Sequence, residues 1–285
     1  MRFLLAAFLW ILTTALLAVS VPALWAQHTL VDRDGYSALA SSAAKDPALQ
    51  QAMASELGVQ LQRLASGTGY DAGTDLLTRA AGTYTASSVF PGQFAQVNGL
   101  AHDWLFTSRV SRSDASGRWV VDLSPMLADS SFQQTLAQFG IRAPDTLEVP
   151  LTENVSEHLR PGQLHQAAVW GPWVSIGVAV LTAVFALLTL AASRARGKAL
   201  AALGVSALLV GAAGWAGIEI GRRFVDDALN KATGDVHAIA DVMVDHAVGS
   251  MHMWLNLTLT VGGGLVIIGV IVALLSGLGS RRDDV

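Results

Sequence analysis

The chain contains no cysteine among its 285 residues. This excludes disulfides, thiolate nucleophiles, and zinc or iron–sulfur centres held by cysteine. Charge is also scarce: Asp, Glu, Lys and Arg make up 14% of the chain, against about 25% in ordinary soluble domains. The sequence has no internal repeat and no long low-complexity linker.

Charge is absent altogether from four long apolar stretches, none of which holds an acidic, basic or histidine residue. They are residues 3–26, 169–192, 199–218 and 255–278. A helix needs roughly 20 apolar residues to cross a bilayer. The pattern therefore predicts a membrane α-helical protein with four transmembrane helices and the lipid bilayer as its surroundings.

The four stretches divide the chain into segments with different expected surroundings. The predicted organisation is a first helix (1–26), an extracytoplasmic domain (27–168), a second helix (169–192), a basic loop (193–198), a third helix (199–218), an extracytoplasmic amphipathic helix (219–254), a fourth helix (255–278) and a tail (279–285).

Orientation follows from Lys and Arg, which collect on the cytoplasmic flanks of membrane helices. One side of the four-helix arrangement has six of them: Arg2, Arg194, Arg196, Lys198, Arg281 and Arg282. The other side has three: Arg222, Arg223 and Lys231. Both termini are predicted to be cytoplasmic in a plasma-membrane protein, with residues 27–168 and 219–254 outside.

Tryptophan supports the same orientation, because its ring prefers the headgroup region. Five of the eight tryptophans fall at or near one end of the predicted helices: Trp25, Trp170, Trp173, Trp215 and Trp254. They predict an aromatic belt at the outer interface.

The first apolar stretch has two interpretations. Met1-Arg2 is a short basic start, and Val21-Pro22-Ala23 resembles a signal-peptide cleavage site. The apolar run is longer than the roughly 7–15 residues of a usual signal peptide. The sequence therefore favours a retained signal anchor over a cleaved leader.

Residues 27–168 are numerous enough to bury a core. Helices are predicted from Asp46-Pro47 to Gly67 and from about Thr74. Pro91-Gly92 is predicted to break the chain before a third helix over 94–105. A further helical stretch follows Ser124-Pro125 and runs to Gly140. Residues 118–123 and the alternating 147–151 are predicted to pair as strands. The expected class is a mainly helical α+β domain.

This domain is mildly acidic, with nine Lys and Arg against fourteen Asp and Glu. Nucleic acid is not expected as a partner, because binding phosphates requires clustered positive charge.

Several short segments resemble a widespread family of uncharacterised actinobacterial integral membrane proteins. They are Leu24-Trp25 followed by 32–36, residues 46–50, residues 98–102 and residues 120–125. The resemblance implies a helical extracytoplasmic domain, about four transmembrane helices and an envelope location. It implies no activity, so it assigns no functional residues.

Catalytic signatures are weak. His102-Asp103 is reminiscent of paired metal ligands in phosphohydrolases, but no further ligands accompany it, so a helix-surface pair is favoured. Ser124 follows a predicted strand as a nucleophile does in some hydrolases, although a helix cap fits its neighbours better. No phosphate-binding loop, dinucleotide fingerprint or zinc-protease motif is present.

The segment 219–254 holds the strongest metal candidate. His237, Asp241 and Asp245 are four residues apart, so a helix brings an imidazole and two carboxylates onto one face. Such a set is able to bind a divalent ion or to act as a pH-sensitive contact. The alternative is a solvated polar stripe whose apolar side packs on the external domain or lies along the bilayer. No other cofactor is indicated.

Small residues indicate where helices approach closely. Ala213, Gly217 and Gly221 form one small-residue row, and Ala207 and Gly211 form another, with contact expected either within the chain or between copies. Gly262-Gly263-Gly264 suggests a close crossing or a bend in the fourth helix.

These observations favour a non-enzymatic envelope protein whose external domain contacts a protein or envelope component, with self-association as a further possibility. The alternatives are a membrane sensor that responds to an external ligand or divalent metal, and, with less support, an envelope hydrolase.

Overall fold

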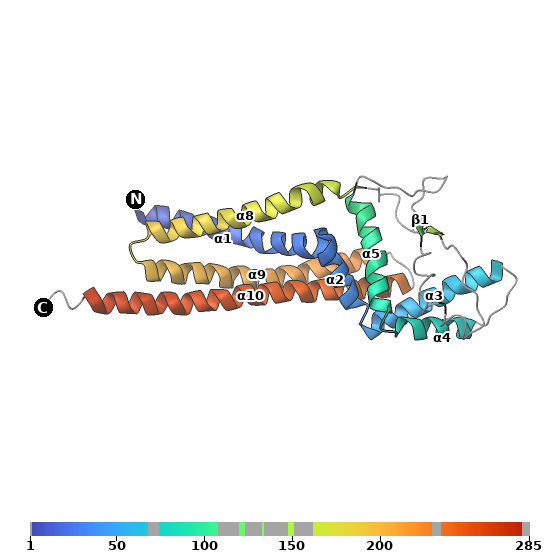
Figure 1. Cartoon of the computed structure of the whole chain (residues 1–285). Helices are drawn as coiled ribbons and strands as arrows, with labels where there is room; N and C mark the ends of the chain where they lie inside the picture. The colour runs from blue at the N-terminus through green and yellow to red at the C-terminus, as the bar shows by residue number, and fades with distance from the viewer. Residues whose placement is uncertain are drawn as a thin grey trace. The chain divides into compact units, whose positions relative to one another are not determined.

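The computed structural model of the chain describes residues 2–67, 74–107, 120–122, 133, 148–150, 162–229 and 235–280. Its elements are α1 (Arg2–Ala26), the π-helical turn η1 (Gln27–Val31), α2 (Arg33–Ala43), α3 (Pro47–Gly67), α4 (Thr74–Thr85), α5 (Phe90–Phe106), β1 (Val120–Asp122), β2 (Glu148–Pro150), α8 (His165–Ala192), α9 (Arg196–Leu229) and α10 (Asp235–Ser280) (Figure 1).

The chain divides into two compact units. We call the first the span unit; it contains Met1–His28, Val169–Val225 and Val248–Val285. We call the second the domain unit; it contains Thr29–Ala168 and Asp226–Ala247. Helix α10 contributes to both, because its first residues belong to the domain unit and the rest belong to the span unit.

Four helices are long and apolar enough to cross a membrane. They cover Leu4–Val31, His165–Ala192, Arg196–Asp227 and Asp235–Ser276. The four predicted spans are therefore confirmed, and the chain is a multi-pass membrane protein by the length and composition of its helices. Large apolar side chains point away from the span unit, as lipid-facing residues do; Leu187 is 65% exposed and Ile267 is 63% exposed.

The prediction of a separate amphipathic helix over 219–254 is wrong. Residues up to Leu229 continue α9 without interruption, and residues from Asp235 onward begin α10; residues 230–234 lie outside the described chain. The helical period predicted within this segment is present in α9 and α10. The sequence alone does not show that these residues extend the two neighbouring membrane helices.

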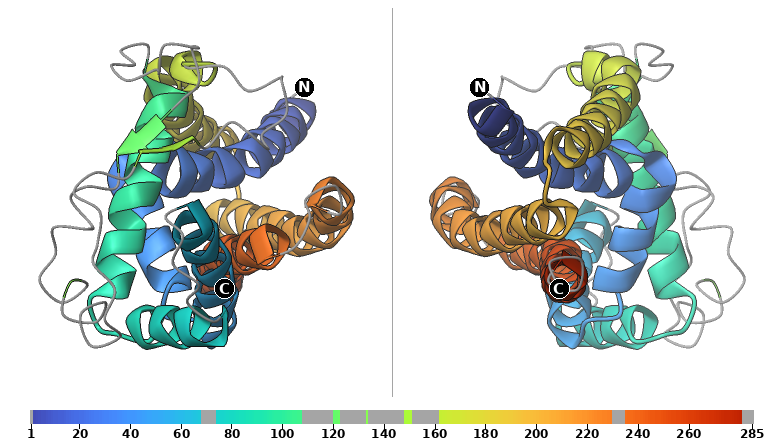
Figure 2. Two further views of the ribbon diagram at one scale, coloured as in Figure 1. Left: turned by 90° about the vertical axis from the view of Figure 1, so that its right-hand side faces the viewer. Right: turned by 90° about the vertical axis from the view of Figure 1, so that its left-hand side faces the viewer.

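Within the span unit, α1, α8, α9 and α10 run alongside one another (Figures 1 and 2). One buried cluster joins α1, α9 and α10 through Val21, Val210, Met251 and Leu255. Because apolar burial drives no association within lipid, contacts of this kind contribute through close packing.

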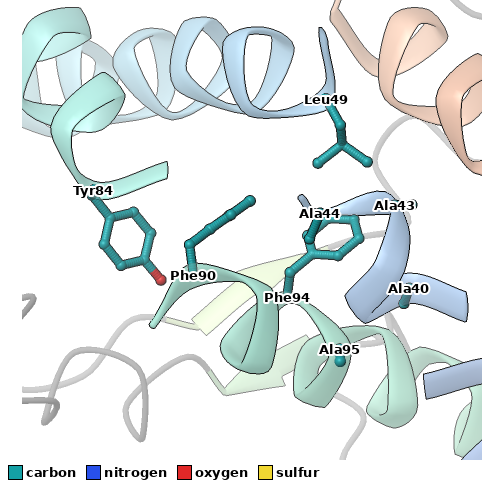
Figure 3. Close-up of a cluster of buried hydrophobic side chains, with 8 residues drawn as sticks. All are labelled: Ala40, Ala43, Ala44, Leu49, Tyr84, Phe90, Phe94 and Ala95. Carbon is teal, nitrogen blue, oxygen red and sulfur yellow. The ribbon is translucent and has the colours of Figure 1, made fainter. Parts of the chain in front are cut away.

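The domain unit has its own core, shown in Figure 3. It is formed by alanines at the end of α2, by Leu49 of α3, and by aromatic side chains of α4 and α5; the cluster is Ala40, Ala43, Ala44, Leu49, Tyr84, Phe90, Phe94 and Ala95. The alanines let the aromatic rings approach the α2 backbone. Burial of apolar surface outside the bilayer stabilises this unit by roughly 25 cal/mol per Å².

Two aspartates fix where its helices begin. The carboxylate of Asp32 accepts a hydrogen bond from the Gly35 amide at 2.9 Å, and that of Asp46 accepts one from the Ala48 amide at 2.8 Å. Both are N-caps, which satisfy amides that a helix leaves free. The helices predicted from Asp46-Pro47 and from Thr74 are confirmed.

The helix predicted over 94–105 is confirmed, but it begins before the predicted break at Pro91-Gly92. Helix α5 begins at Phe90, so Pro91 lies in its first turn, where the missing amide of proline costs no hydrogen bond. Gly99 lies inside α5 where α2 comes close: a Cβ there would be 3.3 Å from the Ser37 hydroxyl.

Among the described residues, the predicted strands form a short antiparallel ladder, in which Val121 lies opposite Val149. Apart from this ladder, the described elements of the domain unit are helices, so the α+β class is not supported. Apart from Gln133, the helix predicted over 124–140 lies outside the described residues.

Candidate functional site

His102 and Asp103 are neighbours in α5 that point to different surroundings. His102 is 5% exposed, and its Nε2 lies 3.1 Å from the carbonyl oxygen of Leu30. A carbonyl only accepts, so Nε2 carries the proton and donates it. Asp103 instead accepts from Arg33, with Nε 3.0 Å from each carboxylate oxygen. The side chains of His102 and Asp103 therefore do not point toward a common metal or ligand position.

The imidazole of His102 is held by aromatic side chains of the domain unit. It stacks on Phe106 with ring centroids 4.2 Å apart, and Tyr36 lies 5.2 Å away. Burial raises the pKa of the Tyr36 phenol, because the charged phenolate is poorly solvated there. This is a packed interior where His102 joins the π-helical turn η1 to α5.

Ser124, the other catalytic candidate, lies outside the described residues.

The three metal candidates in α10 are described by the structure. The imidazole of His237 donates from Nδ1 to the carbonyl oxygen of Leu229, the last residue of α9, at 2.8 Å. It therefore satisfies one of the carbonyls that a helix leaves free at its C-terminus. Asp241 is half-buried and Asp245 is exposed.

No group of three or more His, Asp or Glu side chains is placed to hold a metal ion anywhere in the described part of the chain. Sequence spacing brought His237, Asp241 and Asp245 onto neighbouring turns, but spacing alone does not make their ligand atoms converge. The geometry assigns His237 a structural role at the end of α9.

The apolar side of this α10 segment packs on the domain unit, which was one of the alternatives left open by the sequence. Ile239, Val242 and Met243 lie against the core cluster of Figure 3. Beside them, Nε2 of His246 lies 3.6 Å from the carboxylate of Asp46. Asp46 therefore caps α3 through one oxygen and faces α10 through the other.

The predicted helix-packing row is not where the span unit packs most tightly. Ala213 and Gly217 are exposed, and a Cβ added at Gly217 or Gly221 would meet nothing within 4 Å. This row makes no close contact within the described chain, and its contact between copies stays a prediction. The other predicted row does face α10: a Cβ on Gly211 would lie 2.6 Å from the Leu259 side chain, and one on Gly262 would lie 2.9 Å from the Cβ of Ala207.

The close contact between α9 and α10 uses glycines seven residues apart. Gly197 and Gly204 on α9 face Gly269 and Gly262 on α10. A Cβ at Gly197 would lie 2.7 Å from the Gly269 carbonyl oxygen, and the reverse distance is also 2.7 Å. The predicted close crossing at Gly262 is confirmed, and Gly263 and Gly264 are free of such contacts.

Hydroxyl and indole groups join α1 to its neighbours. Nε1 of Trp10 donates to the Ala202 carbonyl at 2.9 Å, and the hydroxyls of Thr14 and Ser206 are 2.7 Å apart. On the other side, the Thr13 and Thr189 hydroxyls are 3.4 Å apart. These bonds connect α1 with both α9 and α8.

Sequence reasoning did not identify three of these features: helix α2, the Arg33–Asp103 pair and the polar contacts of α1. Asp32, directly before residues 33–43, was an available N-cap signal for α2. The Arg33–Asp103 pair and the Trp10–Ala202 contact leave no local pattern in the sequence, because their members are 70 and 192 residues apart.

Comparison of the chain with models of known protein families, with curated proteins and with solved structures finds no match. The resemblance to actinobacterial membrane proteins therefore stays a prediction.

Proposed function

We propose that the protein is a non-enzymatic binding or assembly protein of the cell envelope. The four-helix span unit anchors it in the plasma membrane, and the domain unit contacts a protein or envelope component outside. Both termini face the cytoplasm in this proposal.

One observation carries the proposal. The polar side chains that suggested chemistry are engaged in holding helices together: His102 with Leu30, Asp103 with Arg33, and His237 with Leu229. A catalytic group needs access to substrate and a partner that activates it. The described residues of the domain unit offer neither arrangement, which favours recognition over catalysis.

The polar contacts of α1 support its retention as a membrane anchor. Trp10, Thr13 and Thr14 make hydrogen bonds with α8 and α9. A cleaved leader has no need for such contacts, and its removal would leave Ser206 and Thr189 without these partners. We therefore propose that α1 is part of the working protein.

A sensor is the second candidate, and one observation favours it. Helix α10 is continuous from the residues that pack on the domain core, such as Met243, to those that pack on α9, such as Gly262. In a sensor, a shift of its first turns would alter the packing of α9 and α10. The backbone-to-backbone contact with α9 opposes this reading, because it leaves little room for sliding.

The binding proposal is tested by photo-crosslinking in intact cells. A photoreactive amino acid is placed at Gln51, Arg79 or Leu100, which are exposed on α3, α4 and α5. Leu187, which is exposed on α8 in the span unit, is the control. We expect one adduct of defined mass from adjacent domain positions and only lipid adducts from Leu187.

The proposal also predicts that charge-reversing substitutions beside the reactive position abolish that adduct. If no domain position yields a protein or glycan adduct, or if Leu187 yields the same adduct, the binding function is contradicted. The sensor is distinguished by spin labels at Leu209 and Ile267: a distance that changes when envelope material is added supports sensing, and a constant distance supports anchoring.

A further inference from the structure

The turn between α8 and α9 concentrates positive charge. Arg194, Arg196 and Lys198 fall within five residues, and all three side chains are exposed. The sequence has no Asp or Glu from residue 158 to residue 218. Within the described chain these three cations form no ion pair. We call them the basic face.

The start of α1 lies at the same level. Trp10 bonds to Ala202 and Thr14 bonds to Ser206, so α1 and α9 run parallel with a constant offset of 192 residues. Both helices rise about 1.5 Å per residue. The same offset carried six residues back places Leu4 level with Arg196, the first residue of α9, and Figure 1 shows the N-terminus beside the α8–α9 turn.

The basic face is held in place by the packing of the residues between its members. Gly197 and Ala199 are buried, and Gly197 contacts the backbone of α10 at Gly269 and Ala273. The first turn of α9 is therefore fixed, and its cations project outward from a rigid segment. A preorganised set of charges binds with less entropic cost than a flexible one.

The position of these charges identifies the ligand. They lie at the ends of two membrane-spanning helices, because α8 ends at Ala192 and α9 begins at Arg196. At this depth the neighbouring molecules are lipid headgroups. Guanidinium groups bind phosphate oxygens through two parallel hydrogen bonds, and juxtamembrane basic clusters attract anionic lipids.

We infer that the basic face binds the headgroup of an anionic phospholipid. This inference does not depend on the function proposed for the domain unit. Phosphatidylglycerol is the probe of choice, since it has a phosphate and no compensating cation. The zwitterionic phosphatidylcholine, whose phosphate is balanced by a quaternary ammonium group, is the matched control lipid.

The test uses the full-length protein in an uncharged detergent and measures equilibrium binding of fluorescent phosphatidylglycerol. We expect it to bind about tenfold or more tightly than phosphatidylcholine. The substitution R194Q/R196Q should weaken phosphatidylglycerol binding by about tenfold or more, since each charge contributes about fivefold. The charge-preserving R194K/R196K should retain most of the binding.

A matched double variant, R222Q/R223Q, removes two positive charges from the other end of α9 and should leave the affinity within about twofold of wild type. The inference is overturned if the two lipids bind equally, if R194Q/R196Q binds as wild type, or if R222Q/R223Q loses as much. It is also overturned if inorganic phosphate or a polyglutamate peptide binds as tightly as the lipid.

Discussion

Gly204 and Gly262 face one another with no side chain between them. A Cβ built on Gly204 would lie 2.6 Å from the carbonyl oxygen of Gly262, and one built on Gly262 would lie 2.9 Å from that of Gly204. Both distances are shorter than atoms of this kind tolerate. The contact thus brings the backbones of α9 and α10 together in the middle of the span unit.

The substitution Gly204→Ala should therefore destabilise the protein, although alanine favours a helix more than glycine does. Overpacking of a tight contact costs about 1–3 kcal/mol. Gly217→Ala on the same helix is the matched control, because nothing lies within 4 Å of the added Cβ. Thermal unfolding in detergent should show a lower midpoint for the first variant and an equal or higher one for the second. Equal midpoints would contradict the assigned register.

The register of this contact illustrates what the sequence could and could not provide. Small residues along α9 predicted that it approaches another helix closely, and this is confirmed. The choice between rows depends on where the facing helix has its own glycines. That relationship joins residues such as Gly204 and Gly262, which lie far apart in the chain, so no local pattern contains it.

The hydroxyl contact between α1 and α9 gives a second prediction. Thr14→Val removes the 2.7 Å hydrogen bond to Ser206 and should cost about 0.6 kcal/mol, with an upper value near 1.7. Thr182→Val is the control, since its hydroxyl bonds, within the described chain, to Val178 of its own helix. Unfolding measurements should separate the two variants. A loss of the same size in both would mean that Thr14 does not join the helices.

The adjacent residues His102 and Asp103 should lose different amounts of stability on substitution. His102→Leu leaves the Leu30 carbonyl without its donor and should cost about 1–3 kcal/mol. Asp103→Asn weakens an ion pair whose side chains are 51% and 40% exposed, and exposed pairs of this kind contribute about 0–1 kcal/mol. Chemical unfolding of both variants checks this. A larger loss in Asp103→Asn would show that the pair has another role.

Alkaline pH should reveal the burial of Tyr36. Its pKa is raised in the folded protein from the ordinary value of 10.0, so above that value the unfolded chain ionises first and folding loses stability. The stability is fully present below pH 10.0 and declines as pH rises toward the folded pKa. Tyr36→Phe removes this decline. Unfolding midpoints between neutral and alkaline pH should diverge between the two proteins; parallel curves would contradict the assignment.

Local signals in the sequence located most of the fold. Uncharged stretches located the spans because the bilayer excludes charge, and Asp46-Pro47 located α3 because capping is a local interaction. Helix α2 was missed because its buried face consists largely of alanines such as Ala40 and Ala43, which give a weak periodic signal. The candidate metal face was overestimated, because helical spacing aligns side chains without making them converge.

The central claim is a four-span anchor that holds the domain unit outside the cell. Because the natural chain has no cysteine, single cysteines can be introduced without background. Ser88→Cys lies in the exposed α4–α5 connection, and Ala195→Cys lies in the exposed α8–α9 turn. A membrane-impermeant maleimide should label Ser88→Cys in intact cells and Ala195→Cys only after permeabilisation. Labelling of both, or of Ala195→Cys alone, in intact cells would contradict the account.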